Sequence, residues 1–162
     1  MTDESRRAFM RSAALAAPLA AGAVAQALGE PGDAPDAGGA SSALRLVEPG
    51  ANLARAVVYG GLVHVSGVLP VKPGTRTMAD DFAAQARQAM DNLRASIEAA
   101  GTRMDRVLKC TCFLTDADDF EAFNRAYTAA FGSHRPARST VIVKALVLAG
   151  AKIEVDCVAA AG

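Results

Sequence analysis

Residues 135–143, RPARSTVIV, and residues 152–157, KIEVDC, alternate in side-chain character as β-strands do. Pro136 cannot donate a ladder hydrogen bond, which favours a position at the start of a strand. Between the two segments, Ala149-Gly150 indicates a turn. We therefore expect the two strands to form a hairpin.

The predicted hairpin carries opposite charges that could meet. Counting by twos puts Arg138 and Thr140 on one face of the first strand and Glu154 on one face of the second. One interpretation is a purely structural cross-strand ion pair. The other is a small polar site at the edge of a sheet. The spacing alone leaves both open.

The remaining sequence predicts an α+β domain with the order strands, helix, strand, helix, strands. Gly60-Gly61 separates two apolar runs and predicts a hairpin with a two-residue loop. The other predicted elements are a strand at 44–47, a helix over 80–100, a strand over 106–115, and a helix that Asp116 or Asp118 caps and Gly132 ends.

Both predicted helices are amphipathic. In the first, Asp80 and Asp81 suit the N-terminal end, Gly101 suits the position after the C-terminal end, and one stripe is apolar at helical spacing. The aromatic stripe of the second is more typical of a core than of a cofactor site. Two helices cover only one face of such a sheet, so the other face needs a different partner. The strand residues Val57, Tyr59, Val63 and Val65 are apolar enough to require burial.

The N-terminus resembles an export signal. Residues 5–11, SRRAFMR, contain a twin-arginine pattern, and an Ala-rich apolar run ends at the A-x-A site Ala23-Val24-Ala25. We expect a signal peptide at 1–25, a flexible Gly- and Pro-rich linker at 26–43, and the domain at 44–162. A short amphipathic or disordered N-terminus is the alternative. The export signal predicts a soluble periplasmic or otherwise exported protein, without stable membrane insertion once the signal is removed.

Composition excludes several classes of function. The 162 residues include 17 basic and 17 acidic ones and no tryptophan, so a nucleic-acid partner has little support. The three cysteines, Cys110, Cys112 and Cys157, favour buried thiols in strands, and the spacing of His64 and His134 does not favour a metal site. We expect neither a metal nor another cofactor.

Further short motifs match a known family in chain order. They are PARS at 136–139, KIE at 152–154, Ser66-Gly67, AQARQ at 84–88, DNL at 91–93, AAG at 99–101, Asp119-Phe120, Asn124 and Tyr127. Over residues 44 to 160 the chain resembles the Rid family of reactive intermediate (enamine/imine) deaminases. That resemblance implies a mixed sheet of the chorismate-mutase-like type with two helices on one face. It also implies homotrimers whose sheets enclose a barrel, with sites between subunits.

The resemblance assigns roles to individual residues. Arg138 would bind the carboxylate of a 2-imino or 2-enamino acid, and Glu154 would hold the attacking water. The other positions expected to bind substrate are Ser66, Gly67, Asn124 and the backbone at Thr140. Glu154 also has a purely structural interpretation as a carboxylate in a buried ion pair, and Asn124 has one as a residue that caps or anchors the following loop.

Two positions depart from the family pattern. Leu53 stands where many deaminases carry a tyrosine that covers the ligand, and Thr140 stands where they often carry cysteine. These changes bear on the range of substrates. The alternative function is a non-catalytic trimeric member of the family that binds a small ligand or acts like a chaperone.

Overall fold

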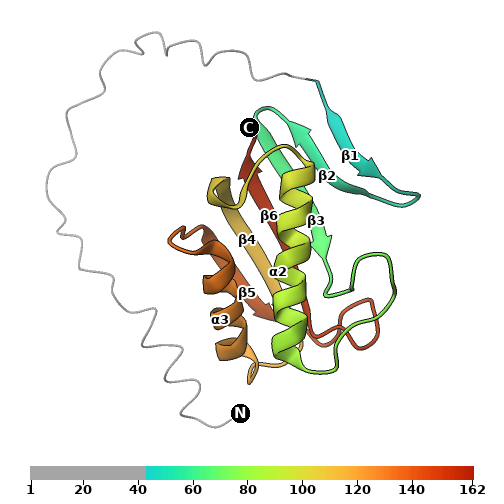
Figure 1. Cartoon of the computed structure of the whole chain (residues 1–162), viewed down its shortest axis with the longest axis vertical. Coiled ribbons are helices and arrows are strands. Elements are labelled where there is room, and N and C mark those ends of the chain that lie inside the picture. The colour runs from blue at the N-terminus through green and yellow to red at the C-terminus, as the bar shows by residue number, and fades with distance from the viewer. Residues whose placement is uncertain (1–42) are drawn as a thin grey trace, which may run out of the picture. The chain divides into compact units, whose positions relative to one another are not determined.

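Six strands and two long helices make up residues 43–162, the part of the chain that this computed structural model describes (Figure 1). In chain order the elements are β1 (Arg45–Pro49), β2 (Ala54–Tyr59), β3 (Leu62–Val68), α2 (Phe82–Ala99), the short 3₁₀ helix η1 (Met104–Arg106), β4 (Val107–Leu114), α3 (Phe120–Phe131), β5 (Ala137–Ile142) and β6 (Ile153–Ala160). The strands form one mixed sheet in the order β1-β2-β3-β6-β4-β5. The predicted α+β architecture is therefore confirmed.

The hairpin at Gly60-Gly61 forms as predicted. Both glycines have positive φ, 57° and 77°, and Tyr59 pairs with Leu62 across the two-residue loop. Positive φ at both loop residues matches the right-handed twist of the flanking strands and is inexpensive for glycine. Local turn chemistry was sufficient to predict this part of the sheet.

The prediction that the last two strands form a hairpin is wrong. A turn does form, with Gly150 at φ 83° and the Ala151 amide donating to Leu148, but β6 does not pair with β5. β4 lies between them, antiparallel to β6 and parallel to β5. The reason is that α3 provides the crossover that a parallel β4–β5 pair requires, which places β5 at the outer edge of the sheet.

The helices begin and end largely where the sequence predicts. Asp81 is the N-cap of α2, accepting a hydrogen bond from the Ala84 amide at 2.8 Å, and Gly101 follows its C-cap with φ 86°. Gly132 ends α3, also as predicted. The predicted cap of α3 is wrong: its N-cap is Asp119, whose side chain makes no capping bond, while Asp116 accepts from the Asp118 amide in the preceding turn.

Both helices pack on the same face of the sheet (Figure 1). The predicted apolar stripe of α2 is buried there and meets Val63 and Val65 of β3. Val57 and Tyr59 lie on the opposite face, which no element of residues 43–162 covers, and Tyr59 is 54% exposed. For Val57 and Tyr59, the expectation that the helices leave one face of the sheet uncovered is confirmed within residues 43–162, whereas Val63 and Val65 lie on the face that the helices cover. Within residues 43–162, neither helix has the length and hydropathy required to cross a membrane.

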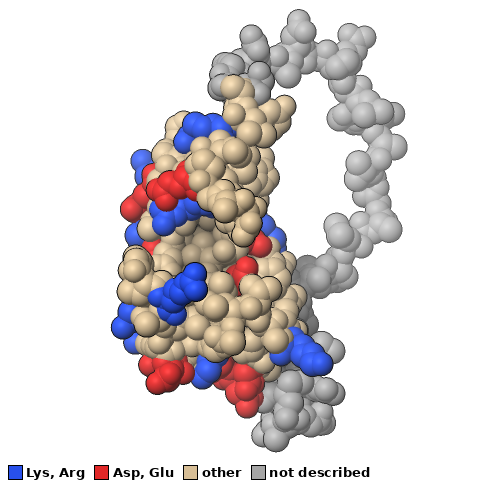
Figure 2. Space-filling view, turned by 90° about the vertical axis from the view of Figure 1, so that its right-hand side faces the viewer, with Lys and Arg blue, Asp and Glu red and all other residues tan. Residues whose placement is uncertain are grey.

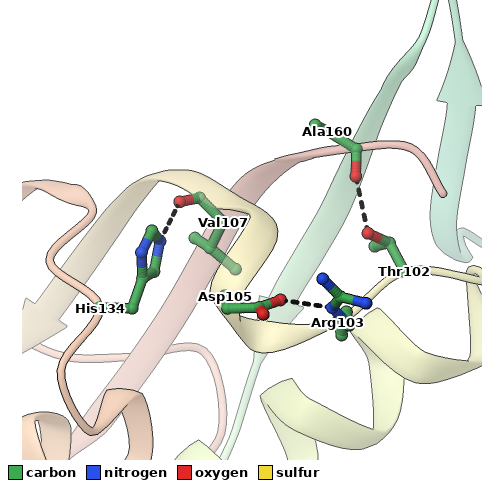
Figure 3. A network of polar contacts seen from close by, with 6 residues as sticks. All are labelled: Thr102, Arg103, Asp105, Val107, His134 and Ala160. Carbon is green, nitrogen blue, oxygen red and sulfur yellow. Dashed lines mark hydrogen bonds and ion pairs between the residues drawn. The ribbon is translucent and has the colours of Figure 1, made fainter.

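Side chains bond the strand ends to neighbouring backbone (Figure 3). The buried Thr102 hydroxyl donates to the carbonyl of Ala160 at 2.7 Å, and His134 Nε2 lies 2.7 Å from the carbonyl of Val107. These contacts connect the end of β6 and the start of β4 to the segments that follow α2 and α3. A hydrogen bond of this kind contributes about 1 kcal/mol to stability.

Candidate active site

Arg138 points toward the helices from the edge strand β5. Its register partner in β4 is Cys110, which also pairs with Cys157 of β6, and both cysteines are buried in the core beneath the helices. Cross-strand partners share a face of the sheet, so Arg138 lies on that face as well. Its guanidinium carbon lies 5.7, 5.1 and 4.7 Å from the ring centroids of Phe120, Phe123 and Tyr127. We call these three rings of α3 the aromatic cage.

The polar partner of Arg138 is an amide. Its Nη2 donates to Oδ1 of Asn124 at 2.9 Å, and within residues 43–162 its guanidinium forms no ion pair with a carboxylate. Thr140 lies two residues further on the same face, and its hydroxyl oxygen is buried without a hydrogen-bond partner among the described residues. Within residues 43–162, one face of β5 thus carries a half-buried cation with spare donors and, two residues further on, a hydroxyl without a hydrogen-bond partner. A guanidinium with spare donors is suited to an anion.

Glu154 lies on the opposite face of the sheet. It pairs in register with Phe113 of β4, which in turn pairs with Val141 of β5, on the face that the helices leave open. Its carboxyl group packs against Gly67 so closely that a Cβ at position 67 would overlap Oε1. Any side chain at position 67 would therefore collide with the Glu154 carboxyl group unless that group moved.

The environment of Glu154 favours its protonated form. Burial is the larger cause of its raised pKa, and the nearby Asp156 carboxylate raises this pKa further. Among the described residues Glu154 forms no ion pair. A carboxylate acting as a base must be ionised, so any reaction that depends on Glu154 should lose rate as the pH falls through this raised pKa.

A cavity of about 430 Å³ opens beside Ser66 and Gly67. Leu53 from the β1–β2 turn also lines it, as do the ion-paired side chains of Glu48 and Arg55, whose charged atoms lie 2.8 Å apart. Figure 2 shows this side of the molecule hollowed, with charged groups of both signs around the hollow. The Ser66 hydroxyl donates to the carbonyl of Ala54 at 2.7 Å, which fixes the β3 end against β2.

The predicted site residues therefore form two groups in one protomer. Ser66, Gly67 and Glu154 lie together at the β3–β6 junction, and Arg138, Asn124 and Thr140 lie together between β5 and α3. The cross-strand ion pair between Arg138 and Glu154 is not formed, because β4 separates their strands and their side chains emerge on opposite faces. We call the two groups the glutamate half-site and the arginine half-site.

The aromatic cage is the feature of the candidate site that sequence reasoning missed. The aromatic stripe of α3 was predicted to be core, and Phe123, Tyr127 and Phe131 are indeed buried. Phe120, Phe123 and Tyr127 also surround the guanidinium of Arg138. Only the parallel pairing of β5 beside β4 brings the arginine under this helix.

The cysteines have the structural role that the sequence favoured. All three are free and buried, and burial raises the pKa of Cys110 to about 11 and of Cys112 to about 12. Thiols this hard to ionise are poor nucleophiles near neutral pH. Within residues 43–162 no cluster of three or more His, Cys, Asp or Glu side chains is arranged to hold a metal ion.

Comparison with known proteins identifies the family of this chain. Residues 44–161 match the family described as Endoribonuclease L-PSP, and the chain belongs to this family. The chain is 42% identical over 106 residues to 2-iminobutanoate/2-iminopropanoate deaminase of Salmonella typhimurium, covering 64% of this chain and 82% of that protein.

Solved structures agree with this assignment. A protein of the conserved Rid family from Yersinia pestis is 31% identical with a TM-score of 0.69, over 73% of this chain and 99% of that one. RidA from the Antarctic bacterium Psychrobacter is 35% identical with a TM-score of 0.65, over 69% of this chain and 92% of that one. The resemblance to the Rid family is confirmed.

Proposed function

We propose that this protein is a hydrolytic deaminase that converts 2-imino or 2-enamino acids to 2-oxo acids and ammonia. The observation that carries the proposal is Arg138, a guanidinium held in place by an aromatic cage and one amide and, within residues 43–162, left without a carboxylate partner. Such a group suits the carboxylate of a small acid, which it can bind through two parallel hydrogen bonds. The name of the 42% identical Salmonella typhimurium relative supports the reaction.

Imine hydrolysis requires the protein mainly to position the substrate and the attacking water. Arg138 holds the substrate carboxylate, and Glu154 accepts a hydrogen bond from a water and directs it at the imine carbon. A C–O bond forms as the C=N bond becomes single, and one proton of the water passes to the nitrogen. The carbinolamine then breaks its C–N bond as its hydroxyl proton passes to the nitrogen, which releases ammonia and leaves the C=O of the 2-oxo acid. An enamino acid first tautomerises to the imine.

The direct test generates imines in situ with an amino-acid oxidase and follows ammonia and 2-oxo acid release. Addition of the protein should accelerate release above the spontaneous rate for at least one small 2-imino acid. A rate equal to the spontaneous one across short, branched, aromatic and acidic side chains would instead favour the alternative, a non-catalytic binding module. Leu53 and Thr140 are the positions whose side chains should govern which substrate is preferred.

Assembly is part of the proposal, because one protomer separates the two half-sites. A second copy that covers the open face of the sheet would bury Tyr59 and Val141, which are 54% and 43% exposed, and could bring a glutamate half-site to an arginine half-site. We expect the processed chain to form a homotrimer at micromolar concentration. Light scattering coupled to size exclusion should give three times the mass of the chain. A monomeric mass would contradict both the trimer and a shared site.

We further propose export by the twin-arginine route to the periplasm. Arg6, Arg7 and the site at residues 23–25 support this, and all of them lie outside the described residues. Replacing both arginines by lysine should retain the precursor in the cytoplasm, because the pair of arginines is the feature by which that route recognises its signals. The readout is fractionation of cells producing each form, with Arg11→Lys as the matched control. Unchanged periplasmic delivery of the double variant would contradict the proposal.

A further inference from the structure

The arginines of the domain differ in the charge of their partners. Arg45 and Arg94 donate to backbone carbonyls, and Arg138 donates to a side-chain amide, so these partners are neutral. Arg55 pairs with Glu48 at 2.8 Å and Arg103 pairs with Asp105 at 2.7 Å, so each of those guanidinium charges is balanced by a carboxylate. Arg138 instead donates to the neutral amide oxygen of Asn124. The rings of the aromatic cage around it are neutral as well.

An amide at position 124 does two things that a carboxylate could not do together. It accepts from Nη2 and so fixes the direction in which the remaining N–H groups of Arg138 point. It also leaves the positive charge unbalanced, whereas an aspartate of the same shape would form an internal ion pair. The ring faces attract the cation without competing for its hydrogen-bond donors.

We propose that Asn124 is a positioning residue for Arg138, and that its lack of charge is what keeps the guanidinium available to a substrate carboxylate. This inference deepens the proposed function and rests on it. It assigns Asn124 to the arginine rather than to direct contact with the substrate. It also divides the arginine half-site between two elements: α3 orients the guanidinium and surrounds it with neutral groups, and β5 supplies the positive charge.

The test compares two substitutions at one position. Asn124→Asp keeps the shape and the acceptor oxygen but adds the balancing charge, and should weaken pyruvate binding in calorimetry and lower kcat/KM for imine hydrolysis by about 100-fold, mainly through KM. Asn124→Ala removes the acceptor and should cost about tenfold. Arg125→Gln changes the net charge of the chain by the same amount as Asn124→Asp from the exposed side of α3, and should stay within about twofold of the unmodified protein.

If the role of Asn124 is only structural, Asn124→Ala should impair the protein more than Asn124→Asp does. If the residue only connected α3 to β5, aspartate would bind Arg138 more strongly and be tolerated better than alanine. That order, with both variants folded by circular dichroism, would overturn the inference. So would a loss confined to kcat with pyruvate binding unchanged, which indicates direct contact with the reacting nitrogen.

The inference and the proposed function can fail separately. A protein that binds pyruvate but hydrolyses no imine would reject the proposed reaction, and the effect of Asn124→Asp on pyruvate binding would still decide the role of this amide. A protein that binds no pyruvate at all would overturn the inference, because an available guanidinium is its premise.

Discussion

Replacing Arg138 by lysine should lower kcat/KM for 2-imino acid hydrolysis more than a hundredfold. This loss corresponds to about 3 kcal/mol of transition-state stabilisation. Lysine keeps the positive charge but offers a point charge on a flexible stem, without the planar fork that binds both carboxylate oxygens. The three N–H donors of its ammonium diverge from one nitrogen, so a lysine bonded to Asn124 has no parallel pair for the two carboxylate oxygens, whereas the guanidinium has five donors in a planar fork. The measurement is steady-state imine hydrolysis beside calorimetric binding of pyruvate.

The matched control is Arg125→Lys, the same substitution one residue beyond Asn124 on the exposed side of α3. It should leave both readouts unchanged. The Arg138→Lys protein should keep its oligomeric mass and its circular dichroism, because a half-buried arginine at the edge strand contributes less to the core than the residues beneath it. Unimpaired turnover in Arg138→Ala would remove this residue from the mechanism.

Mixed oligomers of two inactive variants, Arg138→Ala and Glu154→Gln, should regain activity. Arg138→Ala lacks the carboxylate grip, and Glu154→Gln lacks the charged acceptor for the attacking water, so each alone should be nearly inactive. If every site takes Arg138 from one subunit and Glu154 from its neighbour, a random mixture of equal amounts has both residues intact in about a quarter of its sites. Activity near that fraction of the unmodified protein is the expected result after co-expression.

The positions of Arg138 and Glu154 in one protomer are the basis of this prediction. Arg138 and Glu154 emerge on opposite faces of the sheet with β4 between their strands. A site assembled within one protomer would give no recovery, because each subunit of the mixture carries one defect. Recovery with a monomeric mass would contradict the shared site as well. Glu154→Gln alone should still bind pyruvate, and any acid limb that Glu154 imposes on the pH–rate profile should disappear.

Local features could be predicted from the sequence because their causes lie within a few residues. The buried stripe of α2 follows from helical spacing, its start from the side chain of Asp81, and the β2–β3 hairpin from the two glycines at its loop. The site residues were found as separate positions because the motifs that carry them are short and continuous. What they do in this chain stays a prediction that the experiments above test.

The tertiary structure decided which of these positions meet. Alternation shows that Arg138 and Glu154 lie on strands, but it contains no information about which strand lies between them. The intervening β4 comes from a segment about thirty residues earlier, and the parallel pairing that α3 allows places β5 outside it. That one long-range pairing separates the two charges onto opposite faces, brings Arg138 under the aromatic rings, and leaves Asn124 as its polar partner. Short-range sequence determined the elements and the candidate residues, whereas strand order, which depends on contacts distant in sequence, determined the site.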